Sequence, residues 1–190
     1  MMTVTLRFAT PSLLYKHHKA AAAHQFTGKA HSFLPIIGSK GLREVLVGDD
    51  AATPDIWRLA HLPGSLPAGD YQLVGRFSKQ AVQDMALGVA LANYQYDRKG
   101  HGFRLHHASI DTARLEALTQ SIYLARSLIT QPANRLHTDS FEEQAKAALA
   151  NFKVNVTQGR QLEENFPLIH AVGKASAHAP RLLEATWGNK

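Results

Sequence analysis

The sequence contains no cysteine among its 190 residues. This absence excludes a disulfide framework, and it also excludes any chemistry that needs a thiolate as nucleophile or as metal ligand. Proteins without disulfides are typical of reducing compartments, so the composition favours a cytoplasmic location.

Long hydrophobic runs are also missing. No apolar stretch approaches the ~20 residues that a helix needs to span a bilayer, so we expect no contact with a membrane. The first residues, Met1–Phe8, alternate polar and apolar side chains and have no basic region ahead of an apolar block. This pattern predicts a half-buried strand and not a signal peptide.

The remaining composition is that of a folded protein. Hydrophobic residues make up 45% of the chain and charged residues 19%, which excludes wholesale disorder. A chain of 190 residues can bury a real core, as one large domain or as two small ones.

The net charge of +6 comes mainly from the first quarter of the chain. Six basic residues precede Gly48, against Glu44 as the one acidic residue: Arg7, Lys16, Lys19, Lys29, Lys40 and Arg43. They are spread along the segment without an arginine-rich run, which favours a solvated basic face. Contacts with the phosphates of a nucleic acid remain an open alternative.

The first part of the chain alternates predicted strands and helices. Strands are predicted at Thr3–Phe8, Arg43–Val47 and Tyr71–Arg76, with a short apolar run at Phe33–Ile37. Helices are predicted from Pro11 onward, at Asp55–His61 with Thr53 as its cap, and at Lys79–Asn93 with Ser78 as its cap. This alternation predicts an α/β sheet layered with helices.

A long helix is predicted next, and it has the features of a connector between domains. Asp111 is placed to cap it, and Pro132 ends it. Apolar residues recur every three or four positions along one seam: Leu115, Leu118, Ile122, Ala125 and Ile129.

The last part of the chain predicts the opening of a second α/β domain. Thr138 or Ser140 is expected to cap a helix, and the strand Lys153–Thr157 follows. The elements after it are two short helices, at Gly159–Asn165 and Leu168–Ala175, and a strand that reaches Trp187. We therefore predict three parts: residues 1–108 as an amino-terminal α/β domain, 109–134 as a linking helix and 135–190 as an incomplete second domain.

Several segments, taken in order, resemble one known family. The stretch Ala125–Asn134 reads Ala-Arg-Ser-Leu-Ile-Thr-Gln-Pro-Ala-Asn, and Asn165–Ser176 and Pro180–Trp187 follow it. Further upstream, a helix ends in an aromatic residue followed by Asp97-Arg98. This order resembles the leucine (cytosol) aminopeptidases, although Ser127, Thr130 and Gln131 depart from the family's usual Ala-Arg-Asp-Leu-Ile-Asn-Thr-Pro-Ala-Asn.

The resemblance implies an amino-terminal domain related to the nucleotide-binding macro domains, joined by a long helix to the start of a catalytic domain. It implies a parent enzyme that uses two divalent metal ions, zinc or manganese, to release amino-terminal residues from peptides. The family assembles as hexamers, so the resemblance also implies a homo-oligomer. On this reading the 190 residues serve assembly or regulation, and they end before the metal site.

No catalytic, cofactor-binding or metal-binding residue is predicted in this chain, and we expect the chain alone to be inactive. The family's metal-binding motifs, close to Phe-Asp-Thr-Gly-Gly and Asn-Thr-Asp-Ala-Glu-Gly-Arg, do not occur. The motifs His-Glu-x-x-His, Gly-x-Ser-x-Gly and Gly-x-Gly-x-x-Gly are missing as well, and the turn Gly38–Gly41 lacks the spacing of a phosphate-binding loop.

Some ionisable residues suggest a functional site, but a structural or surface role is favoured for each. They are the neighbours His17 and His18, the pair Asp49 and Asp50, the group His101, His106 and His107, and the residues His170 and Lys174. Adjacent residues point in different directions, and the histidine groups have no acidic partner at a suitable spacing. We therefore assign these side chains to the surface, to turns or to packing.

Two other functions stay open at this stage. The chain could be a free-standing module that binds a nucleotide through a macro-like domain, or a nucleic acid through its basic first segment. It could also be an inactive scaffold that keeps the family fold and lacks the site.

Overall fold

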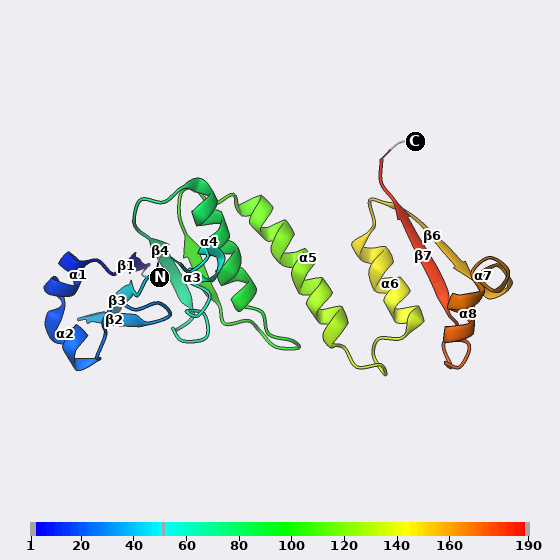
Figure 1. Ribbon diagram of the computed structural model, residues 1–190, viewed down its shortest axis with the longest axis horizontal. Coiled ribbons are helices and arrows are strands. Elements are labelled where there is room, and N and C mark those ends of the chain that lie inside the picture. Colours follow the sequence, from blue (N-terminus) through cyan, green and yellow to red (C-terminus); the bar gives the residue numbers. More distant parts are fainter. Residues whose placement is uncertain (1–2, 51, 189–190) are drawn as a thin grey trace. The chain divides into compact units, whose positions relative to one another are not determined.

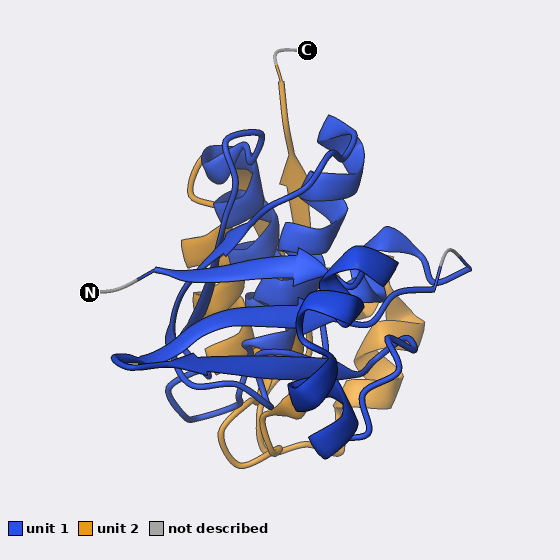
Figure 2. Ribbon diagram, turned by 90° about the vertical axis from the view of Figure 1, so that its left-hand side faces the viewer, with its two compact units in different colours: residues 1–125 blue, residues 126–190 orange. Residues whose placement is uncertain are grey.

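A computed structural model describes residues 3–50 and 52–188 of the chain. The chain divides into two compact units, Met1–Ala125 and Arg126–Lys190, which are coloured separately in Figure 2. Among the helices in the described ranges, none combines the length and the apolar character needed to cross a bilayer.

Unit 1 is built on a five-stranded mixed sheet with the order β2-β3-β1-β4-β5 (Figure 1). Its strands are β1 (Val4–Phe8), β2 (Phe33–Gly38), β3 (Gly41–Val47), β4 (Gly69–Leu73) and β5 (Phe103–His106). Strands β3, β1, β4 and β5 run parallel, whereas β2 pairs antiparallel with β3. The predicted α/β class is confirmed.

Helices cover both faces of this sheet, as the side-chain packing shows. On one face, β-strand residues such as Leu6 and Tyr71 form a core with Val82 and Met85 of helix α4 (Lys79–Ala92). On the other face, Leu34 and Leu46 pack with residues of the short helices α1 (Pro11–Lys16) and α2 (His18–Ala23). Because each strand alternates its side chains between two faces, this sheet is buried on both sides.

Helix α4 begins and packs as its sequence predicts. The hydroxyl of Ser78 accepts a hydrogen bond from the backbone N–H of Ala81 at 3.1 Å, which satisfies one of the unpaired donors of the first turn. Gly88 lies against the neighbouring helix α3 (Asp55–Arg58) so closely that an added Cβ would meet the carbonyl oxygen of Ile56 at 1.6 Å. The glycine is therefore required by packing.

The cap predicted for α3 is wrong. Pro54, with φ −55° and ψ 139°, is the N-cap residue, and no side chain, including that of Thr53, caps the helix. The helix ends at Arg58 and not at His61. Tertiary packing ends the helix here, because Leu59 and Leu62 just beyond it are fully buried in the core.

The long helix α5 (Thr112–Thr130) exists as predicted, and Asp111 caps it by accepting a 3.0 Å hydrogen bond from the N–H of Arg114. Its apolar seam does not form a buried stripe, since no residue of α5 in the described chain is buried and Ile129 is largely exposed. The hydroxyl of Tyr123 donates a hydrogen bond to the carbonyl oxygen of Ala90. This contact holds the helix within unit 1 to the end of α4.

Unit 2 follows the predicted order of helix, strand, two short helices and strand. Its elements are α6 (Thr138–Ala148), β6 (Lys153–Gln158), α7 (Gly159–Asn165), α8 (Pro167–Gly173) and β7 (Arg181–Thr186). Strands β6 and β7 pair antiparallel, and Leu162 of α7 is the single fully buried apolar side chain of this unit among the described residues. The three predicted parts, 1–108, 109–134 and 135–190, remain a prediction.

The predicted cap of α6 is also wrong, because His137 precedes Thr138 and takes the N-cap position. The imidazole Nδ1 of His137 accepts from the N–H of Ser140, while the Ser140 hydroxyl accepts from the N–H of His137 at 3.0 Å. This is a capping box in which histidine replaces the usual serine or threonine.

Candidate functional site

The three histidines near residue 101 do not form a common site. His106 lies 2.8 Å from Asp70, His101 pairs with Gln95 at 3.0 Å, and the Nδ1 atom of His107 accepts from a backbone N–H at 3.1 Å. Each imidazole therefore has its own local partner, and the partner of His106 is an acidic residue that the sequence spacing did not indicate.

Asp70 on β4 and Arg104 on β5 form a salt bridge, and the two residues are partners in the strand register. The guanidinium donates to both carboxylate oxygens, at 2.7 and 2.8 Å. Hydrogen bonds from Arg104 and then from His106 lower the pKa of Asp70 far below its usual range. This cross-strand network is exposed, and it stabilises the surface of the sheet.

The adjacent residues His17 and His18 have different partners in the structure. The His18 ring contacts the carbonyl oxygen of Tyr15 at 3.1 Å, whereas His17 lies 3.9 Å from Glu44. One correction concerns His17, which we assigned to the surface: its side chain is largely buried between α1 and β3. The two rings do not converge, because His17 lies at the junction of α1 and α2 with non-helical dihedral angles, whereas His18 is the first residue of α2.

The two carboxylates of Asp49 and Asp50 also serve separate structural roles. Asp49 binds Arg58, and Asp50 accepts a 2.9 Å hydrogen bond from the N–H of residue 52. In unit 2, His170 lies 3.9 Å from Glu163, and Lys174 forms the C-cap of α8. None of these positions brings a second ionisable ligand to the same point.

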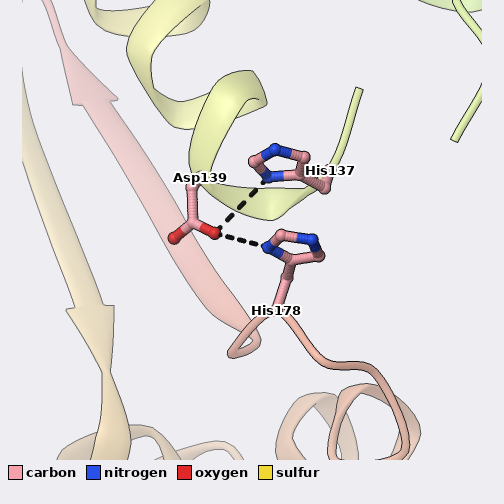
Figure 3. Close-up of side chains that lie close together, drawn as sticks. All are labelled: His137, Asp139 and His178. Carbon is pink, nitrogen blue, oxygen red and sulfur yellow. Dashed lines mark hydrogen bonds and ion pairs between the residues drawn. The ribbon is translucent and has the colours of Figure 1, made fainter. Parts of the chain in front are cut away.

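The residues that do converge are His137, Asp139 and His178, all in unit 2 (Figure 3). Their donor atoms, the Nδ1 atoms of the two imidazoles and one carboxylate oxygen, lie within 4.8 Å of one another. His178 Nδ1 is 2.8 Å from Asp139 Oδ2, and His137 Nδ1 is 3.4 Å from the same oxygen. The two rings stack with centroids 3.7 Å apart.

Two neighbouring side chains hold this cluster together. Arg181, at the start of β7, donates to the other oxygen of Asp139 and to Glu142 on α6. The hydroxyl of Thr138 donates a 2.9 Å hydrogen bond to the carbonyl oxygen of Ala179. The hydrogen bonds from His178 and Arg181 lower the pKa of Asp139, so its carboxylate is ionised at neutral pH.

The sequence pattern did not reveal the cluster, because His178 is 39 residues from Asp139 and no local spacing connects them. The available signal was weak: a histidine and an aspartate flank Thr138 at a predicted helix start, and another histidine precedes Arg181. Only the packing of α6 beside β7 brings the two segments together.

Two family models match the chain in sequence order. The M17 aminopeptidase amino-terminal domain matches residues 16–117, and the catalytic domain of the cytosol aminopeptidase family matches residues 123–190. The chain belongs to the cytosol aminopeptidase family. The resemblance found at Ala125–Asn134 is thereby confirmed.

The relatives found in sequence and structure comparisons agree with this membership. A probable cytosol aminopeptidase 1 from Shewanella oneidensis is 27% identical over 97% of this chain, and a probable cytosol aminopeptidase from Chelativorans is 25% identical over 89%. The chain spans only 42% and 41% of these two relatives.

The crystal structure of the Coxiella burnetii cytosol aminopeptidase matches 99% of this chain with a TM-score of 0.87 and 25% identity, and the chain covers 45% of that structure. The bottromycin maturation enzyme BotP in complex with Mn has a TM-score of 0.76 at 20% identity, covering 99% of this chain and 46% of its own. This second likeness establishes the fold alone.

Proposed function

We propose that this chain is the amino-terminal portion of a metal-dependent leucyl aminopeptidase, in which it serves assembly or regulation. The observation that supports this most strongly is the order of the two family matches, the amino-terminal domain model over residues 16–117 and the catalytic domain model over residues 123–190. The chain spans about two fifths of its curated relatives, so the activity belongs to a longer protein in this proposal.

The parent protein would release amino-terminal residues from peptides with the help of two divalent metal ions, zinc or manganese. It would act in the cytoplasm and assemble as a homo-oligomer, a hexamer by the family resemblance.

The residues of this chain do not fit the metal chemistry of the proposed reaction. A two-metal centre needs several carboxylates that hold both ions a few ångströms apart. The family's lysine and aspartate motifs are missing from the 190 residues. No step of peptide hydrolysis is therefore assigned to a side chain of this chain.

The proposal is tested with a leucine chromogenic amide and purified protein. We expect the 190-residue chain to show no metal-dependent turnover with zinc or manganese, because it lacks the ligands for both ions. A longer protein that includes the sequence encoded after Lys190 should hydrolyse the amide and lose activity when a chelator is added. Turnover by the short chain, or a following sequence without a lysine and aspartate metal motif, would contradict the proposal.

A second function is favoured by one observation, the basic excess of the first 48 residues. Lys16, Lys19, Lys29, Lys40 and Arg43 are all exposed in the structure. In this alternative, unit 1 binds the phosphates of a nucleic acid, or a nucleotide such as ADP-ribose. Titration of the chain with duplex DNA at several salt concentrations, and with ADP-ribose, separates the two functions. Binding to DNA that weakens steeply with salt supports the alternative, and no binding of either ligand rejects it.

A further inference from the structure

We propose that His137, Asp139 and His178 form a binding site for one divalent transition cation, with zinc as the best match. Two imidazole nitrogens and one carboxylate oxygen are a donor set that zinc prefers, whereas magnesium and calcium prefer oxygen alone. The three donor atoms already lie within 4.8 Å of one another. This inference is independent of the aminopeptidase assignment.

A cation between His137 and Asp139 would contact two donor atoms that already lie close together. His137 Nδ1 is 3.4 Å from Asp139 Oδ2. In the structure this nitrogen accepts a long hydrogen bond, 3.4 Å, from the N–H of Ser140, and a cation that takes the Nδ1 lone pair would displace that bond. An imidazole nitrogen and a carboxylate oxygen at this separation can share one cation after small side-chain rotations.

The two imidazoles of the cluster lie side by side. The rings of His137 and His178 are almost parallel, at an angle of 8° with centroids 3.7 Å apart. A metal-binding histidine must be neutral, so the cation would compete with protons for the two Nδ1 atoms.

The supporting contacts orient the carboxylate of Asp139 before a cation arrives. Asp139 uses one oxygen to accept from Arg181, which leaves the other oxygen directed at both imidazoles (Figure 3). Partners of this kind commonly fix metal-binding carboxylates and raise metal affinity. Hydrogen bonds of Thr138 and Arg181 also join α6 to the segment around the start of β7. The ligands are therefore partly ordered already, and less conformational entropy is lost when the cation binds.

The cation would enter from solvent, because the side chains of His137 and His178 are 30% and 42% exposed. It would replace the proton that His178 Nδ1 shares with Asp139 Oδ2 at 2.8 Å, and that proton would leave to water. The two rings must tilt out of parallel to aim both lone pairs at one ion, and their exposure leaves room for this. A water molecule would complete four-coordination.

The test is calorimetric titration of the 190-residue chain with zinc, after treatment with a chelator. We expect one saturable site, and at least tenfold weaker binding in His137→Asn and in His178→Gln. Asparagine keeps an oxygen acceptor for the helix cap, so His137→Asn removes the metal ligand with little harm to α6. His170→Gln is the matched control, because it removes another histidine of unit 2 that lies outside the cluster, and it should bind zinc as the unsubstituted chain does.

A second measurement needs no variant and guards against misfolding. Nitrogen NMR of the imidazoles in the unsubstituted chain should show zinc-dependent shifts at His137 and His178 and none at His170. Magnesium should produce no such shifts. The proposal is overturned if no saturable binding occurs up to about 1 mM zinc, or if both cluster variants keep full affinity.

Discussion

Arg58 and Asp49 join helix α3 to the end of strand β3 through a two-point salt bridge. The guanidinium Nε atom donates to Asp49 Oδ1 at 2.9 Å, and a second nitrogen donates to the other carboxylate oxygen. The guanidinium also lies over the ring of Phe8, 4.3 Å from its centroid. Burial acts to lower the pKa of Arg58, but hydrogen bonds to Asp49 and Asp55 outweigh it and raise the pKa.

We expect Arg58→Ala to lower the free energy of unfolding of unit 1 by about 2 kcal/mol, between the cost of breaking a buried pair and that of breaking an exposed one. The side chains of Arg58 and Asp49 are 16% and 30% exposed, so the loss of Arg58 leaves the partly buried charge of Asp49 without its ion-pair partner. Urea unfolding can be followed by the fluorescence of Trp57 in a Trp187→Phe background, since the chain has only these two tryptophans.

The matched control is Arg160→Ala, which removes an arginine whose salt bridge to Glu164 is exposed and local to α7. Such pairs contribute little, so the urea midpoint of unit 1 should not move. A loss below about 0.5 kcal/mol for Arg58→Ala would mean that solvent screens the Asp49 contact as it screens a surface pair.

Gly88→Ala should destabilise unit 1 although alanine is the better helix former. The propensity gain is at most about 1 kcal/mol, whereas the new Cβ would overlap the carbonyl oxygen of Ile56, which an ideal Cβ would approach to 1.6 Å. The backbone of α3 or α4 must shift, and we expect a net loss of about 3 kcal/mol in the same urea assay.

Gly69→Ala is the control for this change, because its Cβ would meet only a ring carbon of Tyr71 at an ordinary 3.8 Å. It should alter stability by less than about 0.5 kcal/mol. If Gly88→Ala is as stable as the unsubstituted chain, α3 and α4 do not pack as closely at Gly88 as the structure indicates.

Most helices and strands could be predicted from local sequence patterns, because the interactions that form these elements act between residues close in sequence. The alternation in Val4–Phe8 and the cap at Ser78 act over a few residues, so they are readable without the fold. The errors arose where tertiary contacts decide. The helix at Asp55 stops early because buried leucines follow it. At the start of α6, His137 takes the cap position, and its ring also stacks on that of His178, 41 residues further along the chain.

The histidine cluster of unit 2 lay beyond sequence reasoning for a different reason. Local rules detect ligands that share one helix face or one short motif, whereas Asp139 and His178 meet through the contact of α6 with β7. The absence of the family's metal motifs, by contrast, can be established without a structure, because it depends only on the amino-acid sequence.

Unit 1 should lose stability as the pH falls, and His61 is the reason. Burial, and then the nearby charge of His31, lower the pKa of His61 from its usual 6.5. Neither ring nitrogen of His61 has a hydrogen-bond partner among the described residues. The unfolded chain therefore binds a proton more readily than the folded one, so stability is full above pH 6.5 and falls as the pH drops below it.

His61→Leu removes this group and should flatten the dependence of the urea midpoint on pH between about 7 and 5. His24→Gln, which changes an exposed histidine, should keep the slope of the unsubstituted chain. A slope unchanged in His61→Leu would assign the pH dependence to other groups.

Leu162→Ala should unfold unit 2 while unit 1 stays folded. Leu162 is 0% exposed and is the single fully buried apolar side chain of unit 2 among the described residues. A leucine-to-alanine change in a core costs about 2 to 5 kcal/mol, and a unit with so small a core has little stability to lose. Amide hydrogen exchange should therefore show fast exchange in β6 and β7 of the variant, with protection of β1 and β3 unchanged.

Leu168→Ala makes the same chemical change at a side chain of α8 that is 81% exposed, so its exchange pattern should match that of the unsubstituted chain. If β1 and β3 lose protection together with β6 and β7 in Leu162→Ala, the two units unfold as one. The two units would then be compact in structure but would unfold in one cooperative step. One unit can unfold alone only when the stability of the other does not depend on it.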